Sequence, residues 1–204
     1  MPPTRPRLRA RYDLRRQAVV DACAHVFAER GYHATSVAAL LRATGLTAGG
    51  LYHYVATKDE LLFLICEELM DPLLERAQVI AAGEVAPERA LRELVRAWLE
   101  HIERHLDHMR VFQQERHVIE REPRWAQVRE KRLAFERIVD GVLERAGEFD
   151  DRRLALLALL GMVNYTPTWF RPGGRLSARQ IADGYCDLLL DAFAPCPPTR
   201  SPRP

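Results

Sequence analysis

Apolar residues recur along most of this chain at the spacing of one face of an α-helix, and no segment alternates apolar and polar residues as a half-buried strand would. Gly31 follows the first apolar stripe as a typical C-terminal residue of a helix, and Pro87 and Pro123 stand where they can open helices. The pattern predicts an all-α protein of about nine helices. The main stripes run through residues 14–27, 91–102, 128–142 and 181–192.

Proline is concentrated at the two ends of the chain. Eight of the 13 prolines lie at positions 2, 3 and 6 and in the stretch from 195 to 204. Because proline removes a backbone donor and chain ends are often poorly ordered, we expect disordered tails over 1–12, which is also basic, and over 195–204.

Several classes of protein are excluded by what the sequence lacks. No stretch approaches 18 consecutive apolar residues, so no membrane-spanning helix is predicted. The four cysteines are widely spaced, and no apolar segment directly follows the basic N-terminus, so we expect a reduced, cytoplasmic protein. Neither a glycine-rich phosphate-binding motif nor the Glu-x-x-His pair of di-iron bundles occurs, so we predict neither an enzyme nor a cofactor.

Residues 14–62 are the most informative part of the chain. A long helix is predicted to end at Gly31, and a short helix to run over about 36–43 with Thr35 as its N-cap. A second short helix is predicted over about 47–54, with Gly45 supplying a left-handed turn between the two. Two short helices joined by such a turn form a helix-turn-helix.

The string VFAERGYHATSVAALLRATGLTAGGLYHYVATKDELL, residues 26–62, resembles the DNA-binding domain of TetR-family regulators. The resemblance implies a helix-turn-helix domain at 13–58 and a regulator, more often a repressor, that binds double-stranded operator DNA. Val55 stands where the family usually has Phe, which is a packing change. Ala48 and Gly50 stand where longer side chains are common, which reduces the surface available for reading bases.

The second short helix would then lie in the major groove, where its small first-turn residues let the backbone approach DNA closely. Tyr52 and His53 have polar tips that would face the groove, and Lys58 resembles the family's phosphate-contacting lysine. Arg42 is either a phosphate contact or part of a solvated face, and the arginine-rich N-terminus either follows phosphates or keeps a tail soluble. The predicted DNA-binding residues are Thr35, Ser36, Arg42, Thr47, Ala48, Gly49, Gly50, Tyr52, His53 and Lys58.

Residues 59–194 are expected to form a helical ligand-binding and dimerisation domain. The segment 154–163 is apolar on all sides, so a helix there needs cover on two faces, and a second copy of the chain is the simplest cover. This prediction of a homodimer agrees with the family, whose members generally dimerise through their last two helices. The predicted interface residues are Leu157, Gly161, Ile181, Tyr185 and Leu188.

The string GMVNYTPTWFRPGGRLSARQIADGYCDLLL, residues 161–190, is similar to the C-terminal region of a TetR subgroup that responds to acyl-CoA thioesters. It implies a small-molecule effector with an apolar acyl part and an anionic part, which would release the repressor from a palindromic operator. Each aromatic residue named below could instead belong to the ordinary packed core, and Arg171 could instead shape its loop. The predicted ligand-binding residues are Trp98, Phe112, Met162, Asn164, Tyr165, Trp169 and Arg171.

Three histidines, His101, His105 and His108, would share one face of an unbroken helix, as metal-binding pairs do. They give an alternative, a zinc-responsive regulator. A solvated face or a helix break at 106–108 would each remove that possibility, and we assign no metal site.

The formal net charge of +2 averages two different parts of the chain. Residues 1–60 carry nine Lys and Arg against five Asp and Glu, whereas the remainder carries 21 against 23. The basic part coincides with the predicted DNA-binding domain, and its modest excess indicates an affinity that depends on dimeric fit more than on bulk charge.

Overall fold

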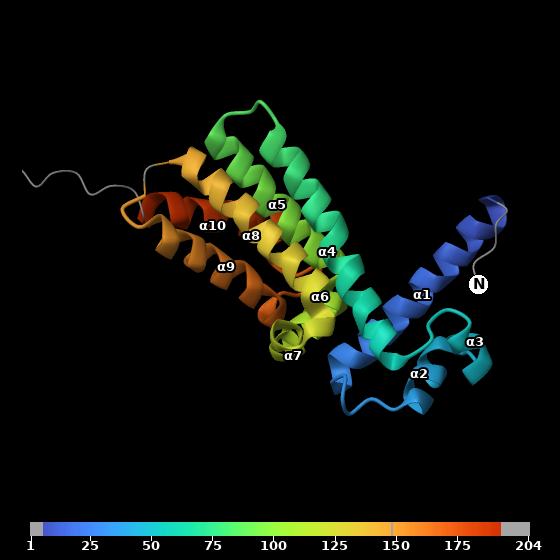
Figure 1. Ribbon diagram of the computed structural model, residues 1–204. Helices are drawn as coiled ribbons and strands as arrows, with labels where there is room; N and C mark the ends of the chain where they lie inside the picture. Colours follow the sequence, from blue (N-terminus) through green and yellow to red (C-terminus); the bar gives the residue numbers. More distant parts are fainter. Residues whose placement is uncertain (1–5, 148, 193–204) are drawn as a thin grey trace, which may run out of the picture. The chain divides into compact units, whose positions relative to one another are not determined.

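The computed structural model describes residues 6–147 and 149–192, which form only helices and their connections (Figure 1). Within these ranges there are ten α-helices and one 3-10 turn, so the all-α prediction is confirmed with one helix more than expected. The elements are α1 (Pro6–Arg30), α2 (Val37–Thr44), α3 (Ala48–Tyr52), α4 (Lys58–Ala82), α5 (Pro87–Arg104), α6 (Leu106–Gln114), α7 (Arg116–Arg121), η1 (Pro123–Trp125), α8 (Ala126–Ala146), α9 (Arg152–Trp169) and α10 (Ala178–Ala192).

The described residues divide into two compact units. The first unit contains residues 6–72 and 105–132, and the second contains 73–104 with 133–192 apart from 148. The division differs from the single predicted boundary after residue 58, because α6 packs against α1 and so belongs with the N-terminal helices. No helix of the described residues is long and apolar enough to cross a membrane.

Helix α1 begins earlier than the sequence analysis predicted. Residues 6–12 are helical rather than a disordered tail, because Pro6 fits the first turn of a helix and Arg9 pairs with Asp13 at 3.1 Å one turn later. Only the C-terminal half of α1 is buried, from Val19 onward; Leu14, expected on the buried stripe, is exposed. The predicted tail at 195–204 lies outside the described residues.

The second unit is built around α5 and α10, which pack side by side. Two ion pairs join them, Arg96 to Asp183 at 2.6 Å and Arg92 to Asp187 at 2.7 Å. A capping box stabilises the start of α10. The Ser177 amide donates to Gln180 Oε1 at 3.0 Å, and the Gln180 amide donates to Ser177 Oγ at 3.2 Å.

Candidate functional site

The helix-turn-helix is present, and side-chain caps fix both of its helices. Ser36 Oγ accepts from the Ala39 amide at 3.3 Å to cap α2, and Thr47 Oγ1 accepts from the Gly50 amide at 3.2 Å to cap α3. Gly45 has φ of 66°, the left-handed conformation predicted for the turn. Helix α3 spans only Ala48–Tyr52, shorter than predicted.

Thr35 is not the cap of α2, so that prediction is wrong, and its burial does not favour the predicted DNA contact. Its side chain is only 3% exposed, and its hydroxyl donates to the Gly31 carbonyl at 2.7 Å. The neighbouring hydroxyl of Ser36 takes the capping position. Thr35 therefore stabilises the end of α1 and is removed from the candidate DNA contacts.

Most of the other predicted DNA-contacting residues lie exposed on α2, α3 and the turn between them. Leu51 and Val55 are buried beneath this surface, which confirms that Val55 is a packing residue. The candidates classed as exposed are Ser36, Arg42, Thr47, Ala48, Gly49, Tyr52 and His53.

The two glycines of α3 differ in how closely other atoms of the chain surround them. A Cβ at Gly50 would lie 3.4 Å from Thr47 Oγ1 and 3.6 Å from the Leu46 side chain, so this half-buried position is constrained by the turn itself. A Cβ at Gly49 would meet nothing within 4 Å, and Gly49 does not have positive φ. Nothing within the fold requires glycine at 49, so the first turn of α3 presents bare backbone to the outside.

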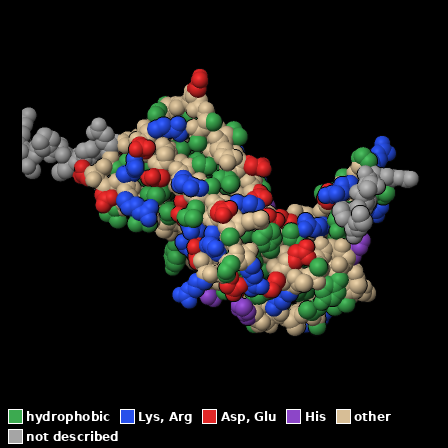
Figure 2. All heavy atoms as spheres, in the orientation of Figure 1, with side chains coloured by type: hydrophobic (Ala, Val, Ile, Leu, Met, Phe, Trp, Pro, Cys, Tyr) green, Lys and Arg blue, Asp and Glu red, His purple; other side chains and the backbone are tan. Residues whose placement is uncertain are grey.

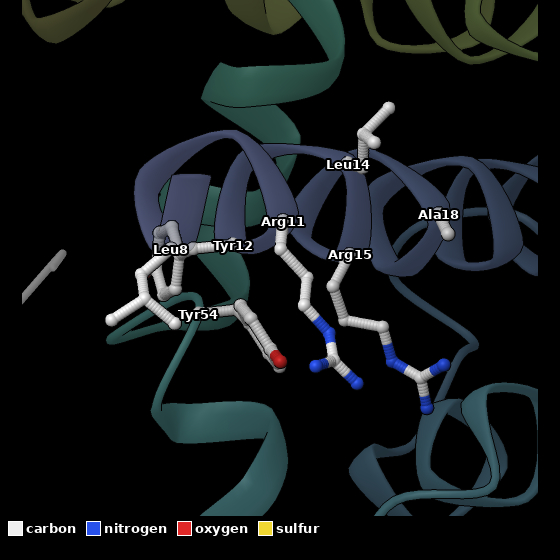
Figure 3. A pocket seen from close by; sticks show the side chains of 7 residues that line it. All are labelled: Leu8, Arg11, Tyr12, Leu14, Arg15, Ala18 and Tyr54. Carbon is white, nitrogen blue, oxygen red and sulfur yellow. The ribbon is translucent and has the colours of Figure 1, made fainter. Parts of the chain in front are cut away.

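The N-terminal half of α1 supports the end of α3 through aromatic contacts. Tyr12 Oη donates to the His53 carbonyl at 3.2 Å, and the Tyr12 ring lies 5.3 Å from the Tyr54 ring, centroid to centroid. Figure 3 shows the guanidinium groups of Arg11 and Arg15 on the same side of α1 as Tyr54, along an open groove of about 730 Å³. Figure 2 shows further arginine side chains along α1.

Lys58 opens α4 but is not a freely solvated side chain. Its Nζ lies 4.3 Å from the centroid of the Tyr32 ring, within reach of a cation–π interaction. Partial burial lowers the pKa of Lys58, while the neighbouring Asp59 acts to raise it. Asp59 itself accepts from the Tyr32 hydroxyl and from Arg124.

An apolar strip on α9 faces solvent, as the apolar sequence of this helix predicts. Leu157 is 48% exposed and lies on one helix face with Leu154, Gly161 and Tyr165. On α10, Leu188 is 62% exposed. These exposed residues include three of the predicted interface positions, Leu157, Gly161 and Leu188.

The other two predicted interface residues pack within the chain. Ile181 is only 4% exposed, and the half-buried Tyr185 hydroxyl lies 2.9 Å from Thr166 Oγ1 of α9. Both residues join α9 to α10, because the face of α10 that carries them is covered by its own chain.

The predicted ligand-binding residues lie in different environments. Trp98 is buried in the second unit, edge-to-face with Phe135 at 4.7 Å between centroids, whereas Phe112 is buried in the first unit. Met162 and Asn164 are half-buried, and Tyr165 is exposed. Helical spacing says which residues share a face but not which helices cover that face, so a single ligand site made of these residues stays a prediction.

Trp169 and Arg171 share a shallow groove of about 280 Å³. Arg171 Nη1 donates to the carbonyl of Phe170 at 3.1 Å. Arg171 therefore also shapes its loop, which was the alternative interpretation of this residue. The other residues lining this groove are Phe170, Gly174, Arg175 and Leu176.

The histidine cluster is not assembled on one helix. Helix α5 ends at Arg104, and His105 has φ of −121° and ψ of 40°, outside the helical region. His101 belongs to the second unit, whereas His105 and His108 belong to the first. Because of this helix break the three side chains do not share one helical face, and the zinc-responsive alternative is not retained.

Comparison with known protein families agrees with this architecture. Residues 19–65 match the family described as bacterial regulatory proteins, tetR family. Residues 84–193, more than half of the chain, match the tetracyclin repressor-like C-terminal domain.

Three individual proteins illustrate the likeness. The HTH-type transcriptional repressor KstR2 of Rhodococcus jostii is 30% identical over 187 residues, 88% of this chain and 91% of that protein. The solved ketosteroid transcriptional regulator KstR2 of Mycobacterium tuberculosis is 27% identical, with a TM-score of 0.82 over 89% of this chain and 95% of the other. The regulator AibR, solved in complex with isovaleryl coenzyme A and operator DNA, is 26% identical, with a TM-score of 0.72 over 89% of this chain and 100% of the other.

These relatives are named as transcriptional regulators, and the two family matches cover both the helix-turn-helix and the helical C-terminal part. The prediction of a DNA-binding regulator rather than an enzyme is thereby confirmed. This chain belongs to the TetR family of bacterial transcriptional regulators.

Proposed function

We propose that this protein acts as a homodimeric repressor that binds a palindromic DNA operator through α2 and α3. The observation that carries the proposal is the first turn of α3, where Thr47 caps the helix and Gly49 leaves backbone bare without any internal need for glycine. Backbone amides at a helix N-terminus suit phosphate oxygens, and a missing Cβ allows close approach. Tyr52 and His53 are exposed at the other end of α3, where they would meet base edges.

Dimerisation through α9 and α10 is the second part of this proposal. The exposed strip of Leu154, Leu157 and Tyr165 is apolar and continuous on one helix face, and Leu188 adds to it from α10. In a two-fold symmetric dimer, this strip of one copy would pack against the same strip of the second copy, and both would be buried. Two helix-turn-helix units held in this way read two half-sites whose spacing the dimer fixes.

The third part is an amphipathic acyl-CoA effector that controls operator binding. The groove at Trp169 supports it, because apolar Trp169 and Leu176 lie beside the cationic Arg171 and Arg175, a pairing suited to an apolar chain with anionic phosphates. The structural likeness to AibR, solved with isovaleryl coenzyme A, adds support. Since AibR was solved with coenzyme and operator together, an effector in such a fold need not exclude DNA.

Operator binding is tested with a DNA duplex that the wild-type protein selects from a random-sequence pool. Fluorescence anisotropy at one fixed salt concentration measures affinity, since phosphate contacts make affinity depend on salt. Tyr52→Ala should weaken specific binding by at least about 5-fold, because a lost base contact costs about 1–3 kcal/mol. Gly141→Ala, on α8 in the second unit and outside the proposed DNA and dimer contacts, is the control. Unchanged affinity in Tyr52→Ala would remove this residue from the interface.

The effector is tested by thermal shift and by operator binding against a panel of acyl-CoA thioesters, with coenzyme A alone and free fatty acids as controls. One thioester should both raise the melting temperature of the protein and change the affinity of the protein for the operator. We expect Arg171→Ala to weaken the response and Arg179→Ala, on α10 outside the groove, to leave it unchanged. Failure of every thioester to bind would refute the acyl-CoA part while leaving the DNA-binding part intact.

A further inference from the structure

Three polar side chains from three helices of the first unit converge beside the helix-turn-helix. They are Asp21 of α1, Glu68 of α4 and His108 of α6, and one ligand atom from each lies within 4.8 Å of the other two. We propose that this trio, called here the α1–α4–α6 cluster, binds one divalent transition-metal cation of the zinc class. The proposal concerns a different set of residues from the three histidines of the sequence motif and shares only His108 with them.

The distances within the cluster fit a coordination shell better than a set of hydrogen bonds. His108 Nε2 lies 3.4 Å from Glu68 Oε2 and 3.5 Å from Asp21 Oδ1. Good N–H···O hydrogen bonds are about 2.7–3.2 Å long, so both contacts are long for that purpose. In a tetrahedral zinc site with bonds of about 2.0–2.1 Å, neighbouring ligand atoms lie about 3.3–3.4 Å apart.

Gln17 of α1 shows where the cation would lie. Its Nε2 donates to Glu68 Oε2 at 2.7 Å and to Asp21 Oδ1 at 3.1 Å, the same two oxygen atoms that face His108. A neutral amide satisfies these oxygens but leaves the charge of two carboxylates uncompensated, whereas a divalent cation compensates both. Turning the amide would present its oxygen as a fourth ligand, and a water molecule is the other choice.

Burial and ligand type both favour a specific site. The His108 side chain is 5% exposed and cannot swing into solvent, while Asp21 at 53% leaves one side open for entry of the ion. The His105 ring meets the His108 ring edge-to-face at 5.5 Å between centroids. One imidazole with two carboxylates suits Zn²⁺, Co²⁺, Mn²⁺ or Fe²⁺, whereas Mg²⁺ and Ca²⁺ prefer oxygen ligands alone.

The position of the cluster suggests what the cation would do. It would fasten α1 to α4 and α6 within the first unit, and α1 and the start of α4 are the helices on which α2 and α3 are carried. A bound ion would therefore stiffen the support of the helix-turn-helix. Binding of the metal itself needs neither DNA nor an acyl-CoA.

His25 provides a matched comparison from the same unit. It also lies beside two carboxylates, Asp107 at 2.9 Å and Glu29 at 3.4 Å, but these contact opposite ring nitrogens, Nδ1 and Nε2. One ion cannot occupy both sides of an imidazole ring, so His25 and its neighbours do not form a chelating set. A His25→Gln variant thus removes a histidine with two acidic partners without touching the proposed site.

The test is calorimetric titration of chelator-treated, full-length protein with Zn²⁺ alone, without DNA or thioester. We expect one saturable Zn²⁺ per chain and a melting temperature that rises with Zn²⁺. Asp21→Asn, at an exposed position that should not impair folding, and His108→Gln should each weaken binding by at least about 10-fold. His25→Gln should bind as the wild type does.

Three results would overturn the proposal. They are the absence of saturable binding, equal affinity in Asp21→Asn and the wild type, or a loss in His25→Gln as large as that in Asp21→Asn. The first result would mean that His108 and Gln17 alone hold the two carboxylates. If His108→Gln fails to fold, Asp21→Asn decides the question. Because no operator or effector is present, each outcome is independent of the proposed regulation.

Discussion

Replacing Gly49 with alanine should weaken operator binding without weakening the fold. A Cβ at this position meets no atom within 4 Å, and the backbone there is not left-handed. Alanine is a better helix former than glycine by up to about 1 kcal/mol in a helix interior, and by less in a first turn, so stability should be unchanged or slightly raised. Any loss of operator affinity in the Gly49→Ala variant is therefore due to the contact with DNA and not to a weakened fold.

The expected loss follows from the proposed close approach of the α3 backbone to DNA. Inserting one methyl group into a closely packed contact costs typically about 1–3 kcal/mol. A dimer presents the same contact twice, so the operator complex should lose at least about 2 kcal/mol, which is about 30-fold in affinity. Gly50→Ala is a poorer probe, because its Cβ would lie 3.4 Å from the capping oxygen of Thr47 and would mix folding with binding.

Fluorescence anisotropy with the selected duplex measures this loss, and thermal unfolding followed by circular dichroism checks the fold. Gly141→Ala is the matched control, since its Cβ also meets nothing within 4 Å but it lies on α8 in the second unit. Its operator affinity should stay within about 2-fold of the wild type, as expected for a site outside the proposed contact. Wild-type affinity in Gly49→Ala would refute the close backbone approach at α3.

Three further predictions concern the dimer, pH and Thr35. Leu157→Glu should give a monomer in light scattering at micromolar concentration while melting as a folded protein, because Leu157 is 48% exposed within its own chain; a persisting dimer would place the interface elsewhere. The hydrogen bond that His25 donates to the Asp107 carboxylate raises the pKa of His25 above 6.5, so this pair adds stability that is fully present below pH 6.5 and is lost as pH rises through the folded pKa. His25→Gln should flatten the pH dependence of the melting temperature in that window, and an unchanged profile would contradict this prediction. Thr35→Val should cost about 1 kcal/mol of unfolding free energy through the lost bond to Gly31, with operator affinity retained; a selective loss of affinity would restore Thr35 as a DNA contact.

The helix-turn-helix could be predicted from sequence because its signals are local. A left-handed Gly45 and the capping hydroxyls of Ser36 and Thr47 act over three or four residues, so the sequence alone indicates the turn and both helix starts to within one residue. That margin was enough to misplace the cap by one position, from Ser36 to Thr35. A one-residue shift on a helix moves a side chain from the exposed face to the buried one, which changed the function assigned to Thr35.

Sites that combine several helices could not be predicted in the same way. The predicted ligand residues all have suitable chemistry, yet Trp98 is buried against Phe135 whereas Tyr165 faces solvent. The α1–α4–α6 cluster is the opposite case, a group of residues that the sequence analysis did not bring together. Asp21 and Glu68 are 47 positions apart, and Glu68 and His108 are 40 positions apart. Each of the three taken alone looks like an ordinary polar residue. Their convergence depends on how α6 packs against α1, which no local spacing encodes.

The modest positive charge of the N-terminal part makes shape more important than charge for operator binding. Two of its cations have partners in the chain: Arg9 pairs with Asp13, and Lys58 lies over the Tyr32 ring. Each phosphate contact adds about 0.9 to the slope of log affinity against log salt concentration, so a DNA-binding part with only a modest excess of positive charge should show a shallow salt dependence. Specific affinity must then come from the fit of two α3 helices to the major groove. The proposed dimer contact on α9 and the bare backbone at Gly49 are for this reason the two features whose loss should be most damaging to operator binding.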